Sequence, residues 1–268
     1  MRFRLSLVII SKNNIIPVNY QYQITAWVYK LLQSSNSPMK RFLFAAGPSH
    51  EAHHRKLFTF SNLDFYPYKV YHPEQMIEIT GRRATFELSF LMDHLAEKFI
   101  LDLFDRQRFS IGNGTNQVTF EVRHIASLTT PQFTETMQYA CQSPIILSRK
   151  TDEIGYPQYL NPIGKGYEQY FKTHLLAKIS TLQLQPVRES VLIEELDIPF
   201  HFQLLSPVRS RIIKLWENTA WEKKVRGFSF KFELTAPLEL HELAYYGGFG
   251  EKNALGFGCC RMLDHKIY

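Results

Sequence analysis

The sequence predicts an α+β protein in which one order of strands and helices occurs twice along 268 residues. Short segments in which apolar and polar residues alternate predict strands, and apolar residues spaced three and four positions apart predict helices. Turns rich in glycine and proline separate these segments. The order, β-α-β-β-α-β, is that of a ferredoxin-like unit. We therefore expect two tandem ferredoxin-like domains, 1–130 and 131–268, that meet near the stretch TTPQFT at 129–134.

The first half contains one complete unit. Apolar and polar residues alternate along 2–10, which is typical of a half-buried strand. From Ile24 onward, apolar residues at positions i, i+3, i+4 and i+7 predict a helix over 20–34. The same patterns predict a strand at 57–63, a strand pair at 68–91 with Gly81 in its turn, a helix at 91–105, and two strands around a turn at 112–116.

The second half repeats this order without repeating the sequence. Pro237 suits the first turn of a helix over 237–246. The other predicted elements are a strand at 143–148, a helix at 164–179, strands at 201–216 and 226–236, and a closing strand, CCRML, at 259–263.

Composition limits the class of protein. A content of 45% hydrophobic and 14% aromatic residues is enough for a packed core. The three cysteines, Cys141, Cys259 and Cys260, have no disulfide framework spacing, which indicates a reduced, cytoplasmic protein. The apolar run at the start of the chain is shorter than the roughly 20 residues that a membrane span needs, and no signal cleavage site follows it.

Charge is distributed unevenly along the chain. The formal net charge is +6, and no acidic residue precedes Glu51. Up to Lys56 the chain has eight basic residues against that single glutamate, so this segment carries +7. Such a charge attracts polyanions, and we expect a nucleic acid as partner rather than a basic charge that serves solubility alone.

The most distinctive motif is GGFGEKNALGFG, residues 247–258, which we call the glycine loop. It contains five of the thirteen glycines, in two Gly-Phe-Gly elements that flank a short insert with Lys252 and Asn253. Glycine allows positive φ and close approach of the backbone to a ligand. We expect a run of exposed N–H groups that binds phosphates. The motif has neither the GK[ST] ending of a Walker loop nor the following βαβ unit of a Rossmann fingerprint.

A histidine-rich segment, GPSHEAHHRKLFTFS at 47–61, admits two kinds of chemistry. Its HEAHH matches the HExxH pattern of zinc proteases, which requires a helix that places both imidazoles on one face. The Gly-Pro before it and the strand pattern after it leave no room for such a helix. The alternative is acid–base cleavage of RNA, in which the substrate's own 2′-hydroxyl is the nucleophile and no metal or cofactor is needed.

The glycine loop, the LHELAYYGG before it and the CCRML after it resemble the C-terminal signature of the RAMP superfamily. More narrowly, they resemble the CRISPR repeat-processing endoribonucleases. This resemblance implies two tandem ferredoxin-like domains. It also implies metal-independent cleavage of CRISPR repeat RNA in precursor crRNA, giving 2′,3′-cyclic phosphate and 5′-hydroxyl ends. The implied partners are that RNA and other subunits of a CRISPR effector complex, with no membrane.

The resemblance also implies site residues. Members of that family use a tyrosine on the first helix, a histidine in the next loop and a lysine six positions later, before an LFT(F/Y)S strand. These positions correspond to Tyr29, His50 and Lys56. Independently, Tyr29 lies about 140° from Ile24 around the helix, off the apolar stripe. The segment leaves open whether His50, His53 or His54 is the acid–base group.

We expect a second set of residues to bind the RNA backbone. The set comprises Gly248, Gly250, Lys252, Asn253, Gly256 and Gly258 of the glycine loop and, from a basic strand, Arg209 and Arg211. Two other functions stay open: a non-catalytic RNA-binding member of the same superfamily, and a metal-dependent hydrolase that uses HEAHH. The catalytic set favours the nuclease over the first, and a chelator separates the second from both.

Overall fold

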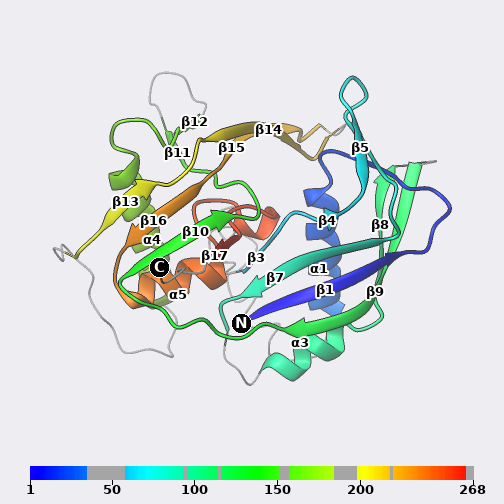
Figure 1. Ribbon diagram of the computed structural model, residues 1–268, viewed down its shortest axis with the longest axis horizontal. Coiled ribbons are helices and arrows are strands. Elements are labelled where there is room, and N and C mark those ends of the chain that lie inside the picture. Colours follow the sequence, from blue (N-terminus) through cyan, green and yellow to red (C-terminus); the bar gives the residue numbers. More distant parts are fainter. Residues whose placement is uncertain are drawn as a thin grey trace.

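The computed structural model describes residues 1–34, 58–92, 96–113, 116–150, 157–183, 198–217 and 220–263. Two antiparallel sheets, each with helices on one face, lie side by side (Figure 1). One sheet is built from strands of the first half of the chain and the other from strands of the second half.

The first sheet has the ferredoxin-like strand order. Its path is β3-β7-β1-β9-β8, with β4 beside β7, so the first strand lies at the centre next to the third and last strands of the motif. The bounds are β1 Arg2–Ile9, α1 Gln21–Ser34, β3 Phe58–Phe60, β4 Asp64–Phe65, β7 Arg83–Phe90, α3 Glu97–Phe104, β8 Arg108–Asn113 and β9 Asn116–Ser127.

The core of this half follows from the alternation that the sequence shows. Phe3, Leu5 and Leu7 of β1 are buried on one sheet face. Helices α1 and α3 contribute apolar side chains to the same core, and the Trp27 ring of α1 lies 5.3 Å from that of Phe104 in α3. The helix predicted at 20–34 is confirmed as α1. Of the helix predicted at 91–105, the described part is α3, Glu97–Phe104, and 93–95 lie outside the described residues.

A small third sheet corrects the predicted strand pair at 68–91. Its order is β2-β6-β5, with β2 Ile15–Pro17, β5 Tyr68–Tyr71 and β6 Met76–Ile79. The turn of the β5–β6 hairpin lies at 72–75, so the assignment of the turn to Gly81 was wrong. Gly81 instead joins β6 to β7 of the large sheet, where a Cβ atom would lie 2.9 Å from the Tyr66 carbonyl oxygen.

The second large sheet repeats the ferredoxin-like order as β13-β16-β10-β17. Its elements are β10 Thr136–Cys141, α4 Tyr167–Gln183, β13 His201–Leu204, β16 Lys231–Thr235, α5 Leu238–Gly247 and β17 Cys260–Met262. The first strand of this half is therefore β10, and the prediction of 143–148 was wrong. Ile145 and Ile146 are buried in two different apolar clusters, and the segment forms only an isolated bridge from Ile145 to Phe228.

Two long basic segments, each predicted as one strand, divide into two. Residues 201–216 form β13 and then β14, Arg209–Leu215, while the strand predicted at 226–236 comprises the end of β15, Lys223–Ser229, and then β16. Strands β14 and β15 make a hairpin whose inner side chains Ile213, Leu215 and Val225 cover Ile146 and Phe257. In Figure 1 this hairpin crosses the top of the molecule from the second sheet toward α1. The remaining short pair is β11 Ser148–Lys150 and β12 Pro157–Tyr159.

Arg2 joins the two halves and is not the surface residue that its alternation with Phe3 suggests. It is 2% exposed. Its guanidinium donates hydrogen bonds of 2.7 Å to the Cys260 carbonyl and 2.6 Å to the Tyr245 carbonyl, and it stacks on the Tyr245 ring at 3.7 Å. A buried guanidinium with these partners is a structural contact between β1 and the C-terminal segment. No helix in the described ranges has the length and apolar content to span a bilayer.

Candidate functional site

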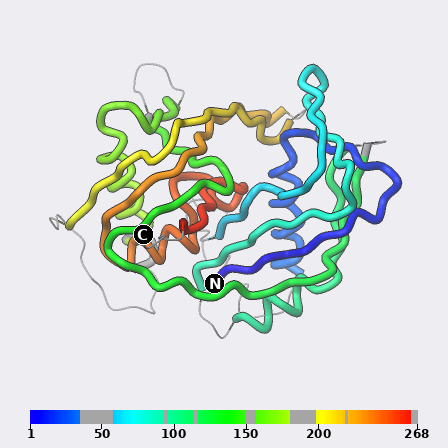
Figure 2. Tube along the Cα trace, in the orientation of Figure 1, coloured from blue at the N-terminus to red at the C-terminus, as the bar shows by residue number. Residues whose placement is uncertain are grey.

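The glycine loop connects α5 to β17 and lies between the two halves. Figure 2 shows this segment, in orange to red, near blue α1 and cyan β3. Its described turn, η3, spans Asn253–Leu255. The expectation of positive φ is confirmed, with values of 93°, 68°, 84° and 72° at Gly248, Gly250, Gly256 and Gly258.

The glycines are needed because protein atoms, rather than a ligand, lie beside them. A Cβ on Gly250 would collide with the Ile146 carbonyl oxygen. On Gly256 it would lie 2.5 Å from the Phe60 ring, and on Gly258 it would collide with the Phe249 carbonyl oxygen. The four glycines therefore allow the loop to pack tightly on itself and on β3.

Several N–H groups of the loop donate to protein carbonyls, so not every N–H group of the motif is available to a phosphate. Phe249 donates to the Gly258 carbonyl, Glu251 to Ile146 and Gly258 to Pro144. The N–H groups of Leu255 and Gly256 close the η3 turn. These hydrogen bonds fix the shape of the loop around its tip.

Lys252 forms that tip. Its backbone is left-handed, with φ 57°, and its side chain is 35% exposed. The Nζ atom lies 3.8 Å from a carboxylate oxygen of Glu251. That carboxylate is fixed from the other side, since the N–H and Oγ of Ser148 donate to it at 2.6 and 2.9 Å. Lys252 can therefore present a positive charge from a fixed backbone position.

Asn253 is buried, whereas its predicted role in RNA binding suggests an exposed side chain. It is 7% exposed. Its Nδ2 donates 3.0 Å bonds to the Phe249 and Phe257 carbonyls, and its Oδ1 accepts from Lys178. The side chain links the two Gly-Phe-Gly elements to each other instead of pointing to solvent.

Two threonine hydroxyls of the first half of the chain form hydrogen bonds with the loop. Thr25 of α1 donates to the Ala254 carbonyl at 3.1 Å, and Thr59 of β3 donates to the Phe257 carbonyl at 2.8 Å. Ala254 is buried within the apolar core of the first half. The structure therefore places the loop directly on the helix that carries Tyr29 and on β3, the strand at the end of the histidine-rich segment.

Tyr29 lies one helical turn beyond Thr25. It is half-buried at the edge of the core, and its ring meets Phe58 edge-on at 5.6 Å. The predicted position off the apolar stripe is in keeping with this, since the fully buried α1 residues include Ile24 and Val28 but not Tyr29. Burial raises the pKa of the Tyr29 phenol above its usual value, so the group stays protonated near neutral pH.

His50 and Lys56 lie outside the described residues, as do His53, His54 and the rest of HEAHH. In the sequence, Lys56 stands two positions before Phe58, the ring that contacts Tyr29. Within the described part of the chain, no group of three or more His, Cys, Asp or Glu side chains is arranged to hold a metal ion.

The two predicted RNA-binding arginines of β14 have different surroundings. Arg211 donates a 2.6 Å hydrogen bond to the Val18 carbonyl of the first half, so its guanidinium supports the hairpin. Arg209 occupies an exposed position. Other exposed basic residues of the hairpin are Lys223, Lys224 and Arg226.

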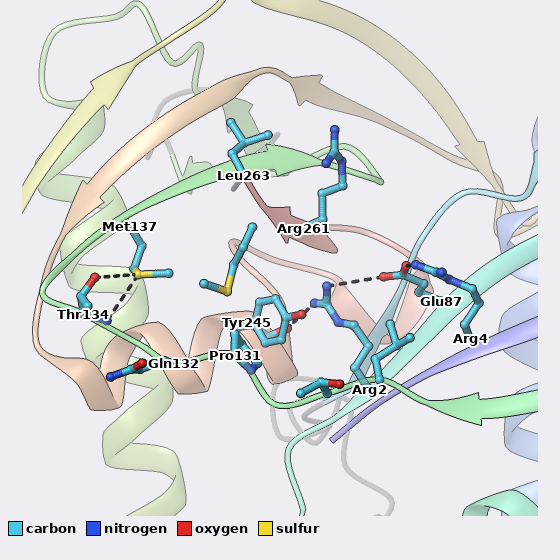
Figure 3. Close-up of a pocket in the computed structure, with 13 residues that line it drawn as sticks. Arg2, Arg4, Glu87, Pro131, Gln132, Thr134, Met137, Tyr245, Arg261 and Leu263 are labelled. Carbon is cyan, nitrogen blue, oxygen red and sulfur yellow. Dashed lines mark hydrogen bonds and ion pairs between the residues drawn. The ribbon is translucent and has the colours of Figure 1, made fainter. Parts of the chain in front are cut away.

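A cavity of about 480 Å³ lies around Arg2, between β1 and the C-terminal segment (Figure 3). Its charged residues are Arg2, Arg4, Arg261 and Glu87, and Glu87 contacts both Arg2 at 3.6 Å and Arg4 at 2.9 Å. None of the predicted site residues that the structure describes lines it. Sequence reasoning missed it, because β1 meets β17 only in the folded chain.

Two family models match the chain. The model described as CRISPR-associated protein Cas6, N-terminal, matches residues 15–126, and that for CRISPR associated protein Cas6, C-terminal, matches residues 128–262. A relative named CRISPR-associated endoribonuclease Cas6 1, from Methanocaldococcus jannaschii, is 28% identical over 256 residues, or 94% of this chain and 89% of the relative. CRISPR-associated endoribonuclease Cas6 from Pyrococcus furiosus is 26% identical over 274 residues, covering 99% and 91%.

A solved structure described as a Cas6-related gene product from Pyrococcus furiosus has the same fold. It superimposes with a TM-score of 0.79 at 19% identity, over 99% of each chain. The tandem ferredoxin-like architecture predicted from the element order is confirmed by this likeness and by the strand order of both large sheets.

Proposed function

Since this chain belongs to the CRISPR-associated Cas6 family, we propose that it is an endoribonuclease that cleaves CRISPR repeat RNA in precursor crRNA. Relatives that align over nearly the whole chain carry the name endoribonuclease. The observation that carries the proposal is the contact of the glycine loop with α1 and β3 through Thr25 and Thr59. This contact supports the proposal because it puts the loop to which we assign RNA binding next to Tyr29 and the strand after Lys56.

The proposed reaction is attack of the ribose 2′-hydroxyl on the adjacent phosphorus, with departure of the 5′-oxygen. His50 removes the 2′-hydroxyl proton, because an imidazole changes protonation near neutral pH. Tyr29, a phenol that is protonated at neutral pH, donates a proton to the leaving oxygen. Lys56 stabilises the negative charge that develops on the phosphate oxygens. The products are a 2′,3′-cyclic phosphate and a 5′-hydroxyl, and no metal takes part.

The glycine loop binds the RNA backbone in this account. Lys252 at its tip contributes a charge, and the glycines and Asn253 hold the tip in place. Arg209 and the exposed basic residues of the β14–β15 hairpin extend the positive surface for further phosphates. Arg211 contributes indirectly, because its hydrogen bond to Val18 holds the hairpin against the first half.

We assign the two roles to two domains. The first, 1–130, carries the catalytic residues, and the second, 131–268, carries the glycine loop. The assignment is supported by the strands of 2–127 and 136–262, which form separate large sheets. By the family resemblance, the reaction takes place in the cytoplasm and the product RNA passes to other subunits of a CRISPR effector complex.

The test is incubation of the purified chain with end-labelled RNA of the repeat that lies beside its gene, in EDTA. We expect one cut within each repeat. Binding without any cut, with or without added metal, would favour the non-catalytic RNA-binding member of the superfamily. Cleavage only after divalent metal is restored would favour the HEAHH hydrolase.

A further inference from the structure

A lysine from outside the glycine loop is buried beneath it. Lys178 belongs to α4 and is 9% exposed. Its Nζ donates hydrogen bonds to the Gly248 carbonyl at 2.5 Å and to Oδ1 of Asn253 at 2.7 Å. Both acceptors belong to the loop, and no predicted catalytic or RNA-binding role involved α4.

The contact with Asn253 decides how that amide is oriented. With Oδ1 facing the Lys178 ammonium, Nδ2 faces the carbonyls of Phe249 and Phe257, one from each Gly-Phe-Gly element. The Phe257 carbonyl also accepts the bond from Thr59 of β3. A continuous path of hydrogen bonds therefore runs from α4 through the loop to β3.

The buried position of Lys178 disfavours its charged form. Burial lowers its pKa from 10.5 to about 7, and the carboxylate of Glu251 offsets only part of that shift. An apolar side chain would fill the same volume without removing a charge from water. A lysine here is therefore best explained by what it does to the loop, because the general stability of the core would favour an apolar residue.

We propose that Lys178 is a positioning residue of the RNA-processing site: by orienting Asn253 it fixes the spacing of the two Gly-Phe-Gly elements and holds Lys252 and the loop against β3. This inference rests on the proposed nuclease function. In this proposal, Lys178 does not contact the RNA and acts only through the glycine loop. It predicts that activity depends on Lys178 although the residue lies beneath the binding surface.

The variant Lys178→Met tests this, with Lys165→Met as the matched control. Lys165 is exposed just before α4, so its replacement removes the same charge and leaves the loop unchanged. Losing the donor to two buried acceptors should lower the single-turnover cleavage rate at saturating RNA by about tenfold or more. Lys165→Met should cut at the wild-type rate, and the unfolding midpoints of both variants should stay within about 5 °C of wild type.

A double-mutant cycle with Asn253→Ala separates this role from a general structural one. If Lys178 acts through Asn253, then Lys178→Met in the Asn253→Ala background should lower the rate by no more than about twofold further. Independent, multiplying losses would contradict the proposal. Should Lys178→Met fail to fold, Lys178→Leu, which also removes the N–H donor, is measured by the same criteria.

The outcomes distinguish this inference from the function on which it rests. A wild-type chain that cuts no repeat RNA would overturn the nuclease proposal itself. A wild-type chain that cuts, together with Lys178→Met or Lys178→Leu variants that cut equally fast, would overturn the role of Lys178 alone.

Discussion

The hydroxyl of Thr59 donates a 2.8 Å hydrogen bond to the main-chain carbonyl of Phe257, a residue 198 positions later in the chain. This bond joins β3, the strand at the end of the histidine-rich segment, to the glycine loop. Thr59 is fully buried, so water does not replace it as a donor. In the proposed function, this bond helps to set the position of the RNA-binding loop relative to the catalytic segment.

Thr59→Val should therefore disturb function more than its small change in shape suggests. Loss of the hydroxyl should lower the free energy of unfolding by about 1 kcal/mol, and the loosened loop should slow single-turnover cleavage several-fold. Urea unfolding and cleavage rates measure the two effects. Thr136→Val is the control, because it removes a comparable 2.9 Å hydroxyl contact, to Thr235, within the second sheet. Equal cleavage rates in the two variants would argue against the role of the Thr59 bond.

Gly256→Ala should cost more than its positive φ alone explains. Gly256 and Gly166 have nearly the same φ, 84° and 81°, but a Cβ on Gly256 would lie 2.5 Å from the Phe60 ring, while nothing lies within 4 Å of Gly166. Gly256→Ala should lower the free energy of unfolding by roughly 1–3 kcal/mol more than Gly166→Ala does. It should also weaken RNA binding, which Gly166→Ala should leave unchanged. Wild-type RNA affinity in a folded Gly256→Ala chain would show that the loop packing does not matter for binding.

Lys252→Ala tests the contact at the loop tip. Removing one phosphate contact should weaken RNA binding and reduce the slope of log Kd against log salt concentration by about 0.7, the value for one contact to single-stranded RNA. Filter binding over a series of salt concentrations measures the slope. Lys98→Ala on α3 is the control, since Lys98 is an exposed lysine paired with Asp102. An unchanged slope in Lys252→Ala would remove Lys252 from the RNA-binding set.

Apolar periodicity was sufficient to predict the helices. The predicted spans 20–34, 164–179 and 237–246 correspond to α1, α4 and α5 with ends displaced by a few residues. Each of these helices contributes buried apolar side chains to its half. Periodicity failed at 143–148. This segment is not part of the large sheet, and its buried residues Ile145 and Ile146 pack into two different apolar clusters.

Long-range contacts of polar residues were not predictable. Arg2 is buried by Tyr245 and Cys260, which lie 243 and 258 positions away, so no local pattern indicates it. Lys178 and Asn253 belong to elements that meet only in the folded chain. The glycine loop could be identified from its sequence. What its glycines contact could not, since Ile146 and Phe60 are distant in the chain.

His50→Ala should lower the single-turnover cleavage rate by roughly 10²–10⁴-fold, the usual contribution of one acid–base group. RNA affinity should change no more than a few-fold, because a neutral imidazole adds little to phosphate binding. His53→Ala and His54→Ala are the matched controls and should cut at rates near that of wild type. Full activity in His50→Ala, with a loss in either control, would move the acid–base role along the segment.

The central claim is that the substrate's own 2′-hydroxyl cuts the RNA without a metal. The most direct measurement compares two repeat RNAs in EDTA that differ only by a 2′-deoxy substitution at the scissile nucleotide. The account predicts that both bind equally well, that the all-ribose RNA is cut to 2′,3′-cyclic phosphate and 5′-hydroxyl ends, and that the deoxy RNA stays intact. Cleavage of the deoxy RNA at the same position would contradict the account.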